Sequence, residues 1–219
     1  PAAMYQVEEA RPGTIEFRAV HDGEVIGTSD SAVAVLAARQ WLWRPQGLAL
    51  ELLAAHVMPN APEITLLLGA ASEYARSITS QSQIDGYQSG PDRVDELASA
   101  IYAAVVDWGV RYSEPPASWT DQGQKIRTPR DLHETKLGTC LDTTLLFAAA
   151  LEQAGIRPLV WMLRGHAFVG WWRYEIDSWT SVNSDVAEVI NRLELGHIGL
   201  VETTLATKRD DKVAFADAR

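Results

Sequence analysis

Several features that would place this sequence in other protein classes are missing. It holds one cysteine, Cys140, in 219 residues, so it can form no internal disulfide and no cysteine-based structural zinc site. No uncharged apolar run reaches the length of about 18 residues that a membrane-spanning helix needs. The first residues, PAAMYQVEEARPG, lack the basic and apolar regions of a signal peptide. These absences favour a reducing, cytoplasmic setting with no membrane partner.

Basic residues are also in short supply. Lys and Arg number 19 against 29 Asp and Glu, which gives a net charge of -10, and the basic residues are scattered. This balance argues against direct binding of nucleic acid by this chain. The absence of a Gly-rich phosphate loop excludes an ATPase of that type. The five histidines show no paired metal-ligand spacing, so we expect no metal and no cofactor.

What is present is the composition of a folded domain, with 47% apolar and 22% charged residues. The chain begins at Pro1 without Met and stops at Arg219 in a polar stretch, which indicates a module of a larger multidomain protein. Strands are predicted between residues 14 and 37. Apolar and polar residues alternate over 14–20, a turn signal follows at 22–23, and extended runs lie at 24–28 and 32–37. Two or three strands on their own are only marginally stable in water. We therefore interpret residues 1–43 as the tail of an upstream β-sandwich, or as an edge hairpin packed on the main domain, residues 44–219.

Beyond residue 43, helical patterns come first and strands follow. Apolar spacings of three and four predict helices over 48–57, over 63–79 and from Pro91 to about Tyr112. Capping signals predict a short helix over 128–136 and a longer one over 141–154. Strands are expected at 159–163 and 166–172, then a helix over 185–195 and a last strand over 197–207. This order predicts an α+β fold.

The residues with chemical potential lie in the second half. Cys140 begins an apolar helix, where unpaired N–H groups and the helix dipole favour a thiolate. His166 opens a strand 26 residues later, and a histidine facing such a cysteine can take the thiol proton. A carboxylate must then hold the imidazole tautomer, and Asp177, Asp185 and Glu202 are candidates. The plain alternative is a small core cysteine and a structural histidine.

Taken together, these residues resemble a known family. The sequence GTCLD at 138–142, the helix end at 155–156 and GHAFV at 165–169 resemble transglutaminase-like domains of the papain-like cysteine protease superfamily. The resemblance covers about residues 115–207, with the helices from residue 63 packed behind. Segments at 52–60 and 86–88 resemble a narrower group, embedded in large bacterial helicase-associated proteins. The family implies a papain-like core, with the cysteine on a helical half and the histidine and carboxylate on an antiparallel sheet.

The resemblance also implies roles for individual residues. By position, Cys140 is the nucleophile and His166 the base of a catalytic triad. The Asp-x-Thr of the family falls on 202–204, where Glu202 stands in place of Asp. We favour Glu202 as the third member because we expect it in the middle of a strand beside a Thr. Asp177 is the rival orienting residue.

Two further positions concern the environment of the cysteine. The backbone N–H of Cys140 is the natural oxyanion donor. Gln124 or Trp119 would supply a side-chain donor, unless both are packing residues of the loop. Asp142 lies in the first helical turn, where a carboxylate is favoured by the helix dipole. We interpret Asp142 as support for the helix N-terminus in preference to a catalytic role.

The function implied is thiol-dependent acyl transfer on peptide or glutamine-type amides, by a cysteine peptidase, deamidase or transglutaminase. Proteolysis or deamidation is favoured over cross-linking. Peptide-N-glycanase relatives carry a Cys-rich zinc site that this chain lacks. The alternative is a catalytically inactive scaffold or peptide-binding module. The expected partners are a protein or peptide substrate and the rest of the larger chain.

Overall fold

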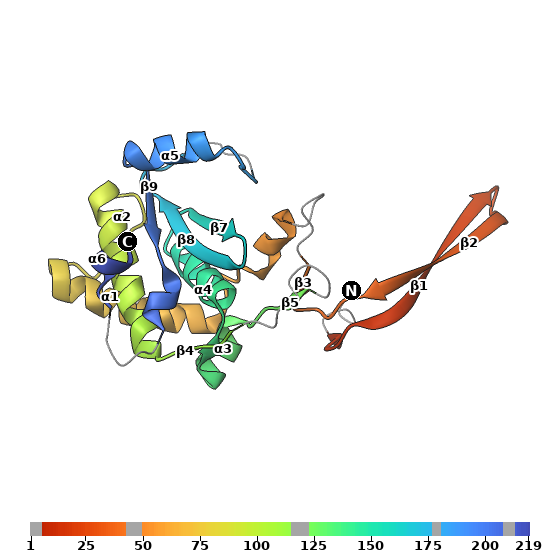
Figure 1. Ribbon diagram of the computed structural model, residues 1–219, viewed down its shortest axis with the longest axis horizontal. Coiled ribbons are helices and arrows are strands. Elements are labelled where there is room, and N and C mark those ends of the chain that lie inside the picture. Colours follow the sequence, from red (N-terminus) through yellow and green to blue (C-terminus); the bar gives the residue numbers. More distant parts are fainter. Residues whose placement is uncertain (1–5, 43–49, 115–122, 177–180, 208–212) are drawn as a thin grey trace.

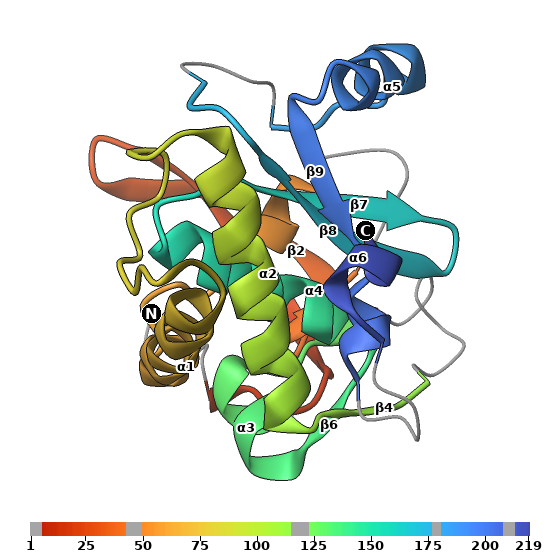
Figure 2. The same cartoon turned by 90° about the vertical axis from the view of Figure 1, so that its left-hand side faces the viewer.

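The computed structural model describes residues 6–42, 50–114, 123–176, 181–207 and 213–219. The fold is α+β, as predicted (Figure 1). A three-stranded antiparallel sheet of order β7-β8-β9 packs against α4, and α1 and α2 contact α4 in turn. Figure 2 views this arrangement with α2 in front of α4. None of the helices in the described ranges has the length and apolar character needed to cross a membrane.

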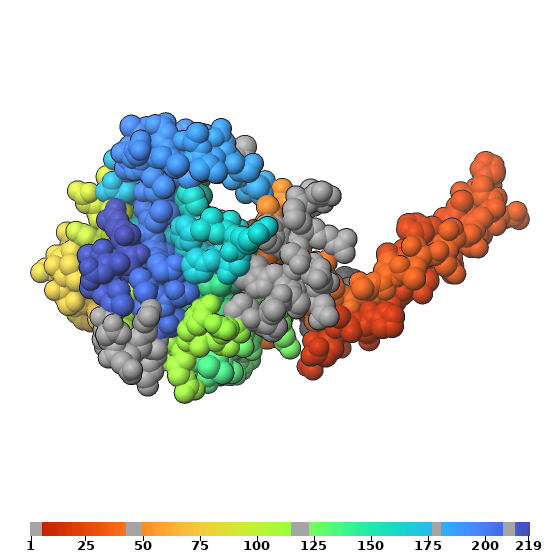
Figure 3. Space-filling view, in the orientation of Figure 1, coloured from red at the N-terminus to blue at the C-terminus, as the bar shows by residue number. Residues whose placement is uncertain are grey.

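A long hairpin near the N-terminus projects from the body of the molecule (Figures 1 and 3). It consists of β1 (Arg11–His21) and β2 (Glu24–Val35), joined by the predicted turn, in which Asp22 and Gly23 both have positive φ. No residue in either strand is buried. The run at 32–37 forms no separate strand, because residues 32–35 continue β2. The assignment of 1–43 to an upstream sandwich stays a prediction.

The helices of the first half agree with the sequence in part. α1 (Pro62–Thr79) and α2 (Pro91–Trp108) both begin at a proline, which suits the first helical turn. The prediction that the second helix reaches Tyr112 is wrong. Gly109 adopts φ 68 and ends α2, and the chain then forms β4 (Arg111–Tyr112). Of the helix expected over 48–57, the structure has the 3-10 helix η2 (Glu51–His56), while 48–49 lie outside the described residues.

α3 (Pro129–Thr135) and α4 (Cys140–Gln153) each begin with a capping box, in which a Thr and an Asp exchange side-chain and backbone hydrogen bonds. All residues of α4 from Cys140 to Leu151 are buried, so this helix is the centre of the domain. Two short ladders lie beside its N-terminus. β3 (Gln40–Trp41) pairs antiparallel with β5 (Gln124–Lys125), and β4 pairs parallel with β6 (Leu137–Gly138).

The sheet follows α4 along the chain. β7 (Pro158–Leu163) and β8 (His166–Trp172) form the predicted hairpin, and β9 (Ile198–Val201) pairs with the other edge of β8 after α5 (Val186–Glu194). The last strand is shorter than the predicted 197–207. It ends at Val201 because the Glu202 carboxylate caps the 3-10 helix η3 (Thr203–Ala206), which turns the chain away. The short helix α6 (Phe215–Ala218) completes the described chain.

Candidate active site

His166 and Glu202 lie together at one end of the sheet. His166 is the first residue of β8, and Glu202 follows the last residue of β9. Because these strands are antiparallel, with Val169 opposite Val201, the start of β8 and the end of β9 lie at the same end. The imidazole Nε2 is 2.6 Å from Glu202 Oε2, and the two side chains are 35% and 29% exposed. The structure thus brings these two predicted site residues together.

The second oxygen of Glu202 is also held. Oε1 accepts hydrogen bonds from the backbone N–H of Thr204 at 2.9 Å and from the Thr204 hydroxyl at 2.7 Å. Glu202 was expected in the middle of a strand, and that prediction is wrong, since the residue caps η3. The turn fixes the carboxylate so that one oxygen faces the chain and the other faces His166. Fixing the acceptor in this way also fixes the orientation of the imidazole.

Cys140 is the first residue of α4 and is 1% exposed. The backbone N–H groups of Leu141 and Ala167 lie near its sulfur, where they act to lower the pKa of the thiol. Ala167 directly follows His166 on β8. The cysteine therefore lies beside the beginning of the strand that carries the predicted base.

The protonation of Cys140 differs from the expectation for a helix N-terminus. Burial raises the pKa of the thiol, and the nearby charges of Glu202 and Asp142 raise it further. The two backbone N–H groups act in the opposite direction, and their effect is smaller. The raised pKa favours the thiol over the thiolate that the position at a helix N-terminus predicts. Position in the chain could not reveal this, because burial depends on the tertiary fold.

Asp142 is fully buried and is bound on both oxygens. Oδ2 accepts the Thr139 N–H at 2.9 Å and Arg127 Nη1 at 2.9 Å, while Oδ1 accepts the Arg127 N–H at 2.8 Å. In return, the Thr139 hydroxyl accepts the Asp142 N–H at 3.2 Å. These bonds cap α4 and tie it to the segment before α3. The interpretation of Asp142 as support for the helix N-terminus agrees with this network.

Gln124 lies beside the same cap. The side chain is 4% exposed, and its Nε2 donates to the Thr139 hydroxyl at 2.9 Å. Its Oε1 is buried, and within the described chain it has no hydrogen-bond partner. The antiparallel pairing of Gln124 with Trp41 holds the backbone. The other two predicted site residues, Trp119 and Asp177, lie outside the described residues.

One residue of this region was not predicted from the sequence. Tyr112 was assigned to the end of a helix, but it lies on β4 opposite Gly138, two residues before Cys140. Burial raises the pKa of Tyr112, and the neighbouring Cys140, Glu114 and Glu202 raise it further. No sequence periodicity marks this residue, although Gly109 is a signal that the helix ends before it.

An aromatic surface continues from the imidazole along the sheet. The Phe168 ring centroid lies 6.2 Å from that of His166, and Trp161 stacks on Phe168 at 5.7 Å. The register explains this, since Trp161 pairs with Phe168 across β7 and β8. Residues 166 and 168 share one face of the strand because side chains alternate. Any bound chain that reaches His166 along this face would meet these two rings.

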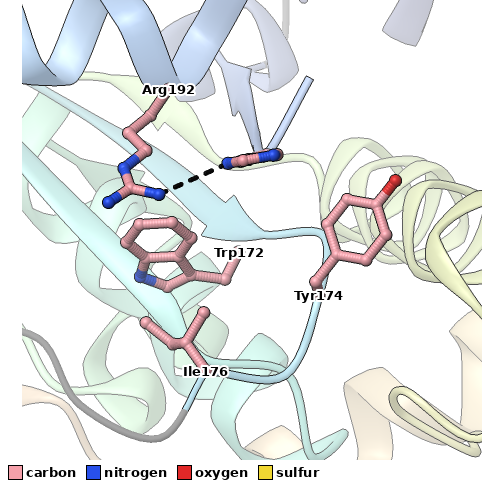
Figure 4. Close-up of a pocket in the computed structure, with 5 residues that line it drawn as sticks. Trp172, Tyr174, Ile176 and Arg192 are labelled. Atoms are coloured by element: carbon pink, nitrogen blue, oxygen red, sulfur yellow. Dashed lines mark hydrogen bonds between the residues drawn. The ribbon is translucent and has the colours of Figure 1, made fainter. Parts of the chain in front are cut away.

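A separate pocket lies at the far end of β8, beneath α5 (Figure 4). Its volume is about 180 Å³, and it is lined by three apolar or aromatic side chains and two basic ones, namely Trp172, Tyr174, Ile176, Arg192 and His197. Arg192 Nη1 and His197 Nδ1 are 3.5 Å apart. Of the predicted site residues that the structure describes, none lines this pocket. In the ranges that the structure describes, no three His, Cys, Asp or Glu side chains gather closely enough to hold a metal ion.

Comparison with known proteins identifies no family. No protein-family model matches the sequence, and no curated protein matches it. A solved structure from Parabacteroides distasonis, described as a "putative protease", is 13% identical, and the match covers 76% of this chain and 36% of that one. The chain therefore spans about a third of that structure's length. The TM-score is 0.33, which is too low to carry an argument about function.

Proposed function

We propose that residues 44–219 carry a transglutaminase-like, papain-like core that performs thiol-dependent acyl transfer on peptide or glutamine-type amides. The observation that supports this is the 2.6 Å contact between His166 and Glu202, beside the strand start at which the backbone N–H of Ala167 lies near the Cys140 sulfur. A nucleophile, a base and a group that orients the base are the components that this chemistry requires.

The contact supports one assignment of the ring nitrogens of His166. With Glu202 accepting the Nε2 proton, Nδ1 carries the lone pair. Since the pKa of Cys140 is raised, the thiol loses its proton during the attack instead of beforehand. Nδ1 takes that proton as the sulfur bonds to the carbonyl carbon, and Glu202 stabilises the imidazolium that forms.

The tetrahedral intermediate then needs donors for its oxyanion. The backbone N–H of Cys140 is one, because the first N–H groups of a helix have no partner within the helix. Gln124 is the second. When its amide turns over, the Thr139 hydroxyl donates to Oε1 and the NH₂ group becomes free for the oxyanion. The imidazolium next protonates the leaving amine, or ammonia from a glutamine amide, and leaves a thioester. Water or an amine then attacks the thioester with the same histidine as base, and the thiol re-forms.

The acceptor we propose is water, as in a peptidase or deamidase. We further propose, from the sequence resemblance, that this module belongs to a larger cytoplasmic protein with helicase-type ATPase regions, and that its substrate is a protein or peptide. The burial of Cys140, at 1% exposure within an apolar cluster, favours a second candidate: an inactive scaffold or peptide-binding module.

Acylation by p-nitrophenyl acetate separates the two candidates. An enzyme releases p-nitrophenolate in a burst of about one equivalent, and mass spectrometry finds the acetyl group on Cys140, the one cysteine of the chain. Cys140→Ala abolishes the burst, and His166→Ala slows it about 100-fold or more. His197→Ala, in the separate pocket, serves as the matched control and keeps the wild-type rate. Equal rates for wild type and His166→Ala would leave the scaffold as the better account.

A peptide mixture containing glutamine and a small primary amine then identifies the acceptor. Cleaved peptides indicate a peptidase, conversion of glutamine to glutamate indicates a deamidase, and incorporation of the amine indicates a transglutaminase. The Cys140→Ala variant gives the background for each product.

A further inference from the structure

We propose that Thr203 is a positioning residue of this site, whose buried hydroxyl ties the turn that carries Glu202 to the helix that carries Cys140. The inference rests on the proposed acyl-transfer function and deepens it. Thr203 acts through Glu202 and takes no part in the bond changes themselves.

The sheet by itself does not hold the Glu202 carboxylate. The ladder between β8 and β9 ends at Val201, so Glu202 lies beyond the paired residues of β9, and His166 lies before those of β8. The backbone N–H of Glu202 donates to Ala218 O at 2.8 Å, which ties it to α6. Its tie to α4, the helix of the proposed nucleophile, comes from the next residue in the chain, Thr203, the first residue of η3.

The hydroxyl of Thr203 meets two hydroxyls of α4. Thr203 Oγ1 lies 3.1 Å from Thr143 Oγ1 and 3.2 Å from Thr144 Oγ1. All three residues are fully buried, so water does not compete for these hydrogen bonds, and they are stronger than they would be in water. Each hydroxyl would lose free energy if its partner were removed. The turn and the helix therefore hold each other in one register.

These hydrogen bonds have a direction, and they end at the residue of the nucleophile. Thr143 Oγ1 donates to the carbonyl oxygen of Cys140 at 3.0 Å. Because a hydroxyl has a single proton to donate, Thr143 accepts from Thr203, and Thr203 in turn accepts from Thr144. The chain of hydroxyls runs from α4 through Thr203 and back to the backbone of Cys140. It fixes the turn that holds Glu202 relative to the residue that carries the sulfur.

The position of this turn matters because the base must face the sulfur. Glu202 holds the imidazole at Nε2, and in the proposed mechanism Nδ1 takes the thiol proton. If the turn shifts relative to α4, the carboxylate shifts with it and the ring loses its fixed orientation. A displacement of about 1 Å between reacting groups costs up to about 100-fold in rate.

The first measurement is the tautomer of His166, read from the nitrogen chemical shifts of the imidazole at about pH 9, where a histidine is neutral. Thr203→Val keeps the shape of the side chain and removes the hydroxyl. We expect the wild type to carry the ring proton on Nε2 and Thr203→Val to populate both tautomers. Thr203→Ser retains the hydroxyl and should restore the wild-type shifts. The signals of His166 are assigned by their loss in His166→Ala.

Thr207→Val is the matched control. Thr207 is 6% exposed, and its hydroxyl donates to Thr204 O at 2.6 Å just after η3. The substitution therefore removes a buried hydroxyl from the same turn without touching the bonds to α4. We expect Thr207→Val to keep the wild-type tautomer of His166 and the wild-type rate of acylation.

The second measurement is acylation by p-nitrophenyl acetate. We expect Thr203→Val to slow it about 10-fold and Thr203→Ser to keep it near the wild-type rate. In the Glu202→Gln background, Thr203→Val should have no further effect, because it acts through that carboxylate. A residue that only supports the fold would slow the reaction by the same factor in both backgrounds.

Two results overturn the inference: an unchanged tautomer of His166 in Thr203→Val, or an equal loss of rate in the Glu202→Gln background. If Thr203→Val does not fold, Thr144→Val replaces it, since it removes one of the two bonds from the side of the helix. An unchanged tautomer in that variant also overturns the inference.

The proposed function is judged separately, by the effect of His166→Ala on acylation. If acylation requires His166 while Thr203→Val keeps the wild-type tautomer, the role of Thr203 fails alone. If acylation is independent of His166, the role of Thr203 in catalysis fails together with the proposed function, whatever the tautomer.

Discussion

His166 Nε2 and Glu202 Oε2 lie 2.6 Å apart although 36 residues separate them along the chain. The antiparallel pairing of β8 and β9 brings their backbones together, and the cap on η3 turns the carboxylate toward the ring. Glu202 therefore has two functions in the fold. It ends the strand through Oε1 and holds the imidazole through Oε2.

Glu202→Gln should change the tautomer of His166 while keeping the shape of the side chain. When the amide oxygen keeps the bond to Thr204, the amide nitrogen faces His166 Nε2 and donates to it. The ring proton then moves to Nδ1, which can no longer accept the thiol proton. We expect acylation by p-nitrophenyl acetate to slow about 100-fold or more. Glu188→Gln on α5 is the control, and an equal rate constant for Glu202→Gln and wild type would exclude a role for this carboxylate.

Gln124→Met should separate an oxyanion donor from a packing residue. Methionine has a similar volume, and Gln124 has a buried Oε1 without a partner in the described chain, so the loss of packing should be small. We expect acylation to slow about 10- to 100-fold, because an oxyanion donor acts on the transition state. Iodoacetamide alkylation, which forms no oxyanion, should keep its rate. If both reactions slow equally, Gln124 acts through the position of Thr139 and Cys140.

The sequence predicted those features of the site that depend on residues close together in the chain, and it failed for those that depend on the tertiary fold. The capping boxes of α3 and α4 were predictable because Thr and Asp three residues apart bind the same helical turn. The position of Tyr112 beside the site was not predictable, because its neighbour Gly138 is 26 residues away and the pairing is set by the tertiary fold. The same limit applies to the raised pKa of Cys140, which follows from burial against the sheet.

Asp142→Asn should destabilise the domain more than the equivalent change in the other capping box. Asp142 is fully buried and pairs with Arg127, whereas the Asp131 side chain is 32% exposed and pairs with Arg39. Loss of the buried charge leaves Arg127 without its partner, so we expect a loss of about 3 kcal/mol in the free energy of unfolding. For Asp131→Asn we expect about 1 kcal/mol. Urea unfolding at pH 7 measures both, and equal losses would contradict the argument from burial.

Asp85 should make stability depend on acid pH. Burial raises the pKa of this carboxyl, but hydrogen bonds from Ser89, Arg93 and the backbone, with the charge of Arg93, together lower it by more, so the net direction is downward. The stability that ionised Asp85 adds to the folded state is therefore complete above the ordinary pKa of 3.8, and it is lost as the pH falls through the lowered pKa. Asp85→Asn should destabilise at pH 7 and approach the wild type at the acid end.

The matched control for Asp85→Asn is Glu96→Gln. Both carboxylates bind the guanidinium of Arg93, which is 3% exposed, but the Asp85 side chain is 16% exposed and that of Glu96 is 39% exposed. At pH 7 we expect the free energy of unfolding to fall by about 2 kcal/mol for Asp85→Asn and by less than about 1 kcal/mol for Glu96→Gln. Urea unfolding between about pH 2.5 and pH 7 measures the difference. A constant gap between wild type and Asp85→Asn across that range would refute the linkage.

Gly199→Ala should destabilise the sheet because the glycine faces a fixed tryptophan. Gly199 lies opposite Trp171 across β8 and β9, and a Cβ there would lie 2.6 Å from the indole Nε1. Trp171 is fully buried and donates to Asp95 at 3.0 Å, so the ring cannot move away without loss of that bond. We expect a loss of about 2 to 3 kcal/mol in the free energy of unfolding.

Gly69→Ala is the opposite case in the same chain. Gly69 is exposed on α1, and nothing lies within 4 Å of a Cβ built on it. Since glycine inside a helix costs about 1 kcal/mol relative to alanine, this change should stabilise the domain by a similar amount. Thermal and urea unfolding of the two variants should therefore shift in opposite directions from the wild type. If Gly199→Ala left stability unchanged, the close packing of β9 on Trp171 would be wrong, and with it the path by which β9 delivers Glu202 to His166.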